Sequence, residues 1–398
     1  MRLHRSTSRS RFPRRRSGGC LSVLFTLCLL VGAVGLMGLW LARLVNRPPA
    51  PIGGGDAFGA AQAAFDQGDL TGAIAHARTY LAVHRDDINT LYLLARALIY
   101  RSYSEYNRAD DRASASAILR EAAQRNPRDI DVLAVHALTL AIDGDAEEAV
   151  AVAERALETE APSAAIAHTA LALAYNTVGG YDTAVRESES AVSTAASRPA
   201  LTDALRALAI AYRDVGRYDE ALTAVDRAID LDDRLLSLHF ERAQYALLLG
   251  DSDSATVSYF NVLTKDAGNI KARLRLCELS SVMRERERAV EYCQAVTAYA
   301  PAWVEGWFRL GMEYFLQGSF EESQRALHRC ATLQTLQDVP TDSLRFECWY
   351  IQGQAAEILG DCVNLPAIYN EWRAIAADRD VRQRWTYPPE GPPGCLIP

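Results

Sequence analysis

The sequence predicts an all-α solenoid of about eight stacked helix hairpins, preceded by one N-terminal transmembrane helix. Three observations lead to this prediction: a short sequence motif that recurs along the chain, amphipathic helix patterns on both sides of each copy of the motif, and a long uncharged run near the N-terminus. In this motif, a turn residue is followed by a small residue five positions later. Copies of the motif begin at Gly68, Gly144, Gly179, Gly216, Gly250, Arg284 and Gly318. The last four members are 34 residues apart. A fixed period of this size is typical of stacked helical hairpins rather than of one globular core.

The first 47 residues differ sharply in charge from the rest of the chain. They contain nine arginines and no acidic residue. The whole chain has 42 basic and 50 acidic residues, so residues 48–398 keep 33 basic against 50 acidic residues, a net charge of −17. A surface that binds nucleic acid needs a dense basic stripe, and a surface that lies on anionic lipid needs basic residues as well. We therefore expect no nucleic-acid partner.

The segment 20–42 is the predicted transmembrane helix. It runs for 23 residues without a charge, and a bilayer core requires about 20 apolar residues in a helix. Seven arginines precede the segment and two follow it, which places residues 1–19 in the cytoplasm as a basic tail and the body on the outer side. We therefore expect a single-pass cell-membrane protein with an extracytoplasmic body. A cleaved signal peptide is the alternative, with a weak cleavage motif at 33–35.

Three further segments follow the predicted membrane helix. Residues 43–55 form a Pro/Gly linker, in which prolines extend the chain and glycines loosen it. Residues 56–377 carry the helical repeats, and residues 378–398 form a proline-rich tail that cannot continue as a helix. The chain has two lysines beside 40 arginines, a usage that suggests a GC-rich bacterial genome.

The repeated unit resembles the tetratricopeptide repeat family. The clearest unit reads Trp307-x2-Leu310-Gly311-x2-Tyr314, which follows the Trp-x2-Leu-Gly-x2-Tyr pattern of that family. Residues 168–191 and 205–228 fit the same pattern, and the resemblance extends over about residues 56–377. It implies a right-handed superhelix whose first helices line a concave, protein-binding face. It also implies that small residues lie where two helices cross and that each turn glycine adopts the left-handed conformation.

The sequence offers no constellation for catalysis. The seven histidines show no metal-ligand spacing, and neither a phosphate-binding glycine loop nor a nucleophile elbow is present. Acid pairs such as Glu147–Glu148 and Glu321–Glu322 open second helices, where carboxylates favour the positive helix end. We therefore expect a protein that is not an enzyme, with no catalytic residue, no metal, no cofactor and no small-molecule substrate.

Six cysteines lie in the last third of the chain: Cys277, Cys293, Cys330, Cys348, Cys362 and Cys395. An even, clustered set beyond a membrane anchor suits an oxidising compartment. The resemblance places Cys277 and Cys293 on facing sides of one hairpin and sets Cys330 opposite Cys348, while the remaining two would tie down the tail. Only the first of these pairings is argued strongly. The alternative is that all six are small buried core residues.

The resemblance also suggests a site. Some family members hold a peptide carboxylate with a set of Lys, Asn and Arg residues on three successive first helices, and this chain does not reproduce that set. The first helices of the later repeats instead carry aromatic residues flanked by arginines, a mixture typical of binding hot spots. The groove candidates are Arg206, Arg213, Phe240, Gln244, Arg275, Phe308, Arg309, Met312, Phe315 and Tyr350.

Three functions agree with these features. The first is a membrane-anchored scaffold that binds peptide or protein partners in the concave groove. The second is an assembly or maturation factor that handles unfolded clients, of the pilus, outer-membrane or cytochrome c type. The third is an accessory subunit of an enzyme complex.

Overall fold

The computed structural model describes residues 54–159, 161–376 and 395. The predicted cytoplasmic tail 1–19, membrane helix 20–42 and nearly all of the linker 43–55 and of the tail 378–398 lie outside these residues. Within the described ranges, no helix combines the length and the apolar composition that crossing a bilayer requires.

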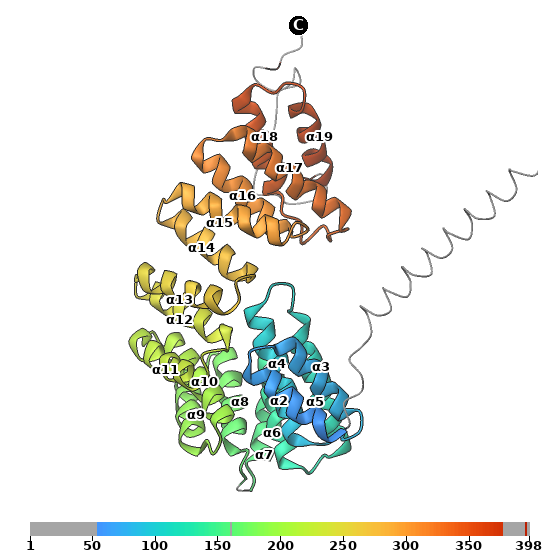
Figure 1. The fold of residues 1–398 in the computed structure, drawn as a ribbon, viewed down its shortest axis with the longest axis vertical. Helices are drawn as coiled ribbons and strands as arrows, with labels where there is room; N and C mark the ends of the chain where they lie inside the picture. The colour runs from blue at the N-terminus through green and yellow to red at the C-terminus, as the bar shows by residue number, and fades with distance from the viewer. Residues whose placement is uncertain (1–53, 160, 377–394, 396–398) are drawn as a thin grey trace, which may run out of the picture. The chain divides into compact units, whose positions relative to one another are not determined.

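Residues 54–376 form helices that pair into successive antiparallel hairpins, and the part of the chain that the structure describes contains no strand (Figure 1). The pairs are α2 (Gly54–Asp66) with α3 (Leu70–Leu81), α4 (Ile88–Ser104) with α5 (Asp110–Arg125), α6 (Ile130–Asp143) with α7 (Ala146–Ala156), α8 (Ala164–Thr177) with α9 (Tyr181–Thr194), α10 (Arg198–Asp214) with α11 (Tyr218–Leu231), α12 (Leu236–Leu248) with α13 (Ser252–Lys265), α14 (Ile270–Val282) with α15 (Arg286–Tyr299), α16 (Val304–Gln317) with α17 (Phe320–Leu336), and α18 (Glu347–Leu359) with α19 (Leu365–Ala376). The all-helical, repeated fold is confirmed. The described residues make nine hairpins, and this corrects the expected number of about eight.

Every one of these hairpins turns through a residue with a positive φ angle. Seven of the turn residues are glycines, which adopt this left-handed conformation without a steric penalty. The other two are Asn107, with φ of 56°, and Arg284, with φ of 63°. The recurrent sequence motif does not include Asn107, so the motif did not predict the turn of the α4–α5 hairpin.

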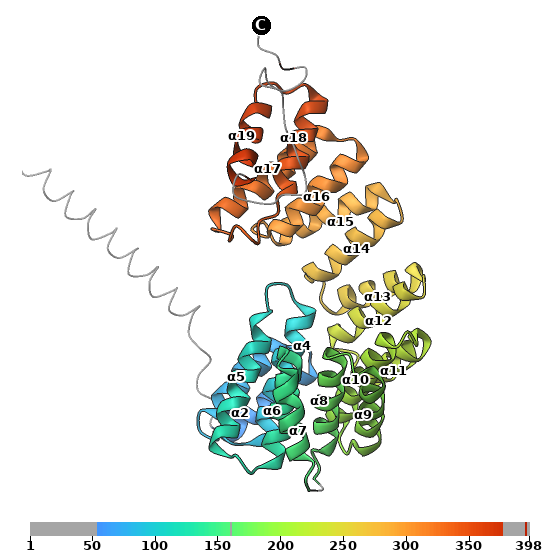
Figure 2. The same ribbon diagram turned by 180° about the vertical axis from the view of Figure 1, so that it is seen from behind.

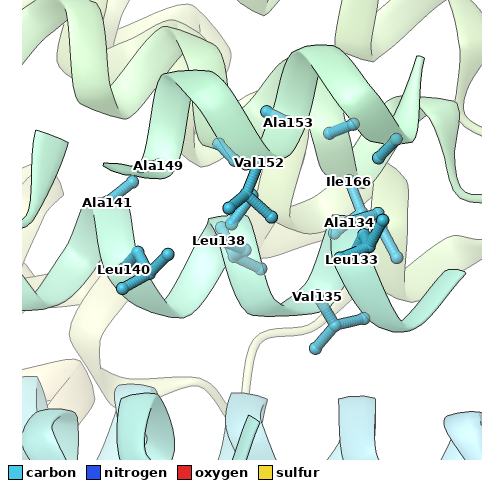
Figure 3. Packing of buried hydrophobic residues seen from close by; sticks show 14 of the residues in the cluster. Leu133, Ala134, Val135, Leu138, Leu140, Ala141, Ala149, Val152, Ala153 and Ile166 are labelled. Carbon is cyan, nitrogen blue, oxygen red and sulfur yellow. The ribbon is translucent and has the colours of Figure 1, made fainter. Parts of the chain in front are cut away.

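Small residues allow the two helices of a hairpin to approach closely. At the crossing of α16 and α17, a Cβ atom added to Gly311 would lie 2.5 Å from Cγ of Leu327. The hydroxyl of Ser323 donates a 2.9 Å hydrogen bond to the Gly311 carbonyl at the same place. Larger residues fill the space between hairpins: Figure 3 shows Leu138, Val152 and Ile166 gathered between α6, α7 and α8. No hairpin buries its apolar face alone, and stacking therefore supplies most of the stability.

The first two hairpins also contact hairpins far along the chain. Helix α4 packs against α6 and against α12, and the interior cluster that contains Phe65 and Leu98 also contains Leu205 and Leu238 (Figure 2). The early hairpins therefore pack against α10 and α12 and do not form the free end of an open stack. The repeat pattern describes only contacts between neighbouring hairpins and could not predict this closure.

Candidate functional site

A buried polar cluster joins α4 to α10. The carboxylate of Asp203 accepts hydrogen bonds from the guanidinium of Arg96 at 3.0 Å and from the hydroxyls of Tyr92 and Tyr100, both at 2.6 Å. Arg96 is 5% exposed and Asp203 is 8% exposed. Burial, followed by the charge of Asp203, raises the pKa of both tyrosines well above its ordinary value, so both hydroxyls remain donors.

This cluster means that the chain fills part of its own concave face. The first helix α10, which the sequence assigned to an open groove, is covered by α4. Arg206, one of the groove candidates, pairs with Glu241 at 2.6 Å between α10 and α12, and its guanidinium lies 4.6 Å from the centre of the Tyr103 ring. Arg206 therefore joins first helices to each other as well as bordering open space.

A cleft of about 750 Å³ opens beside the closure. It is lined by residues of the first helices α6, α8, α10, α12 and α14, along most of the length of α12 and α14, together with Tyr103 near the end of α4 and Tyr259 of α13. Five of the ten groove candidates are among its lining residues: Arg206, Arg213, Phe240, Gln244 and Arg275.

Carboxylates compensate the arginines of the cleft. Arg213 pairs with the adjacent Asp214 at 2.5 Å, and Arg275 pairs with Glu278 at 2.6 Å. The amide of Asn176 donates a hydrogen bond to Asp214 as well. These pairs hold the arginine side chains against the wall and leave little positive charge unbalanced.

Lys271 differs from these arginines. Its ammonium donates to the backbone carbonyl of Tyr103 and lies 5.2 Å from the centre of the Phe240 ring, and no ion pair joins it to a described carboxylate. Burial, with a smaller contribution from the neighbouring Arg275, lowers the pKa of Lys271 to about 8. Lys271 is therefore the cleft cation whose charge the described acidic residues compensate least.

Three buried polar atoms at the cleft have no hydrogen-bond partner within the described residues. They are Oγ of Ser237, Oδ1 of Asn176 and Oε2 of Glu241. A buried polar atom left unpaired costs about 1–3 kcal/mol, so a segment that supplies hydrogen bonds here would be favoured. The three side chains come from α12 and α8, and they line the same cleft as Phe240.

The other five groove candidates lie on the later hairpins and do not line this cleft, although Arg309 pairs with Glu278, which does. Phe308 is 6% exposed in a cluster with Trp349, and the guanidinium of Arg345 lies 4.3 Å from the centre of its ring. Met312 and Tyr350 pack against the same cluster. The ring of Phe315 packs edge-on against the ring of Phe320, with the ring centres 5.4 Å apart, and Arg309 pairs with Glu305 and Glu278. The structure thus separates the ten candidates into two groups.

The six cysteines form three disulfides. Cys277–Cys293 joins α14 to α15, Cys330–Cys348 joins α17 to α18, and Cys362–Cys395 joins the turn before α19 to the tail. The Cα–Cα distances are 5.4, 5.9 and 5.0 Å. These are the pairings that the family resemblance implied, and all lie in the last three hairpins.

The residues that close the fold were not predicted from the sequence, and neither were Ser237 and Glu241, which line the cleft. Tyr92, Arg96 and Tyr100 recur at intervals of four residues, which places them on one face of a helix, and this spacing was a usable signal. Ser237 and Glu241 carried no such signal, because their importance depends on unpaired atoms that only the fold reveals. No cluster of His, Cys, Asp or Glu among the described residues could hold a metal ion.

The comparisons with known proteins agree with the repeats. The model of the tetratricopeptide repeat family matches residues 206–270, and a comparison with curated proteins gives no match. Among solved structures, the C-terminal part of a tetratricopeptide repeat protein from Cytophaga hutchinsonii is 16% identical with a TM-score of 0.51, over 62% of this chain and 96% of that one. At this identity the likeness shows the fold alone.

Two further solved structures are less similar. YrrB, described as a tetratricopeptide repeat protein with an unusual peptide-binding site, is 21% identical with a TM-score of 0.35, over 47% of this chain and 94% of that one. Human IFIT1, solved as a dimer with m7Gppp-AAAA, is 14% identical with a TM-score of 0.48, over 80% of this chain and 81% of that one. Neither likeness is strong enough to carry an argument about the site.

Proposed function

Since this chain is a member of the tetratricopeptide repeat family, we propose that it is a membrane-anchored scaffold that binds a segment of a partner protein in the cleft beside Phe240. Solenoids of this kind generally act by binding and without catalysis. The observation that carries the proposal is that Phe240 lines one cleft together with Ser237, Asn176 and Glu241, each of which has an unpaired polar atom.

The chemistry of the cleft lining fits a polypeptide. Oδ1 of Asn176 and Oε2 of Glu241 are acceptors that backbone N–H groups can satisfy, and Oγ of Ser237 can donate to a carbonyl. Phe240 and Leu247 supply apolar contact beside these atoms. A mainly apolar surface with a few convergent polar groups is the usual composition of a binding site.

The position of the body outside the cytoplasm is part of the same proposal. The uncharged segment 20–42 would hold the chain in the membrane, and its flanking arginines favour a cytoplasmic N-terminus. The three disulfides support an oxidising compartment for the body, because disulfides are rare in reducing ones. Protease treatment of spheroplasts should degrade the body while a cytoplasmic marker survives.

The test of cleft binding is photo-crosslinking in the cells that make the protein, with the full chain. A photoreactive amino acid replaces Gln244, an exposed residue of the cleft, and in a matched control it replaces Arg227, exposed on the second helix α11. We expect a discrete crosslinked protein from position 244 that is lost when Phe240→Ala is added, and none from position 227. Equal products from both positions, or no effect of Phe240→Ala, would contradict the proposal.

A further inference from the structure

Four exposed aliphatic side chains occupy the same position on four successive hairpins. Each lies two residues before the left-handed residue of the hairpin turn: Leu248 before Gly250, Val282 before Arg284, Leu316 before Gly318, and Ile358 before Gly360. Their exposed fractions are 45%, 80%, 48% and 55%, respectively. These four residues are called the aliphatic row below. Apolar side chains that gather at one exposed place, rather than singly, mark an interaction surface.

The position is specific to this part of the solenoid. Of the 15 large hydrophobic residues that are exposed among the described ones, eight lie at the end of a first helix or at its cap: Val178, Leu247, Leu248, Leu249, Val282, Met283, Leu316 and Ile358. On α10 the equivalent position is Asp214, which is paired with Arg213. The row therefore begins at α12 and continues through α14, α16 and α18.

The spacing of the row suits a helix. First helices of stacked hairpins run in the same direction, so their C-terminal ends share one edge of the stack; Figure 1 shows the hairpins α12–α13, α14–α15 and α16–α17 following one another. Among these first helices, α14 packs against α16 and α16 packs against α18, whereas α12 is joined to α14 through α13. Packed helices lie about 8–10 Å apart. An α-helix rises about 10.5 Å over seven residues, at about 1.5 Å each, so a helix laid along the ends of α14, α16 and α18 would meet one row residue about every second turn.

The charge beside the row is negative. The four windows that run from one residue before each row residue to six after it contain eight carboxylates and three guanidiniums. The carboxylates are Asp251, Asp253, Glu285, Glu287, Glu321, Glu322, Glu357 and Asp361, and the guanidiniums are Arg284, Arg286 and Arg288. Arg286 is paired with Glu313 and Arg288 with Glu285, and one further carboxylate of the eight, Glu322, is paired with Arg325, so six carboxylates remain beside Arg284 without an ion pair to a described arginine. A partner with basic residues beside its apolar face would complement this edge.

We propose that the aliphatic row is a docking surface for a basic amphipathic helix of a partner protein. The row is continuous with the cleft, since Val282 and Leu247 also line the cleft, so one partner can occupy both places. The row is nevertheless a second surface, which the proposed cleft function does not require. The excess of carboxylates at this edge favours a basic helix over an anionic lipid surface as the occupant.

The test uses two synthetic 20-residue helical peptides with the same leucine stripe, one with lysines and one with glutamates on the polar face. Binding to the full chain is measured by fluorescence anisotropy for the wild type, for Leu316→Asp with Ile358→Asp, two row residues that do not line the cleft, and for the control Val83→Asp with Leu336→Asp. The control residues are 72% and 70% exposed and lie off the row. Both variants gain the same two charges, which by attraction alone would strengthen binding of the lysine peptide.

We expect the lysine peptide to bind the wild type and the control equally and to bind the row variant at least tenfold more weakly. The glutamate peptide should bind none of them. Equal binding by the row variant and the control would overturn the proposal. It would also be overturned if the row substitutions instead abolished binding to phosphatidylcholine vesicles or self-association of the chain, because the occupant would then be a bilayer or a second copy. None of these results depends on crosslinking at Gln244, so each proposal can fail without the other.

Discussion

The guanidinium of Arg96 and the carboxylate of Asp203 are separated by 107 residues and lie 3.0 Å apart in the interior. Their contact closes the early hairpins onto α10, where an open groove would otherwise continue. The hydroxyls of Tyr92 and Tyr100 complete the coordination of the same carboxylate. The space left for partners is therefore the cleft beside the closure and the surfaces of the later hairpins.

Asp203→Asn should destabilise the protein strongly, because it leaves the buried charge of Arg96 without a counter-charge. Breaking a buried ion pair by removing one partner costs about 3–5 kcal/mol. The matched control is Glu220→Gln, which breaks the exposed pair with Arg217. Such a pair contributes little, because solvent screens the two charges. Urea unfolding measures both free energies; equal midpoints for the two variants would mean that the buried pair does not hold the closure.

Gly311→Ala should cost stability through overpacking, since its new Cβ would meet Leu327 at 2.5 Å. Forcing extra volume into a packed crossing costs about 1–3 kcal/mol. Gly59→Ala is the control, because Gly59 lies in α2 with no atom within 4 Å of the added Cβ. In a helix it should be neutral or stabilising by up to about 1 kcal/mol. Because Leu327 is fully buried, Leu327→Ala is itself destabilising, but it should cost less in the Gly311→Ala protein than in the wild type; equal costs in the two backgrounds would show that the clash is not the cause.

Reduction of the disulfides should loosen only the later hairpins. All three bonds lie between residues 277 and 395, and residues 54–276 contain no cysteine. Hydrogen exchange with and without dithiothreitol should show faster exchange in α14–α19 and unchanged exchange in α4–α10. The double substitution Cys277→Ala with Cys293→Ala should lower the free energy of unfolding by about 2–4 kcal/mol. Faster exchange throughout the chain would contradict independent stabilisation of the two parts.

Lys271 should make stability depend on pH in the alkaline range. Its pKa is about 8 in the folded protein, whereas an unfolded lysine titrates at about 10.4. Below pH 8 both states are protonated, and the folded state bears the cost of burying the charge. Between the two pKa values the unfolded state binds more protons, so this residue's contribution to stability rises with pH.

The measurement is the difference in unfolding free energy between wild type and Lys271→Met from pH 7 to pH 10. We expect the unfolding free energy of the wild type to increase relative to that of the variant as the pH rises through about 8. Lysine-specific NMR supplies a direct check, because the chain contains only two lysines, Lys265 and Lys271. A difference that stays constant over this range would show that the Lys271 ammonium is not held in a desolvated place.

The repeat, most of its turns and the close helix crossings could be predicted from the sequence alone. A left-handed turn requires glycine or a tolerant substitute, and a crossing requires a residue as small as Gly311, so both leave a local trace in the chain. Of the three disulfides, only Cys277–Cys293 was argued strongly, and that argument came from the family resemblance; Cys395 lies beyond the repeats, so their register could not assign its partner. In the groove the prediction was partial: Phe240, Gln244 and Arg275 line the cleft, while Phe308 packs into the core.

The location of the remaining open surface depends on the tertiary structure and could not be predicted from the repeat pattern. The contact of Arg96 with Asp203, the unpaired atoms of Ser237 and Glu241, and the exposure of Val282 all depend on hairpins that are distant in sequence or on the space between helices. A repeat pattern records what each hairpin needs from its neighbours. It carries no record of a helix such as α4 packing against hairpins much further along the chain, because that contact depends on how far the whole stack curves.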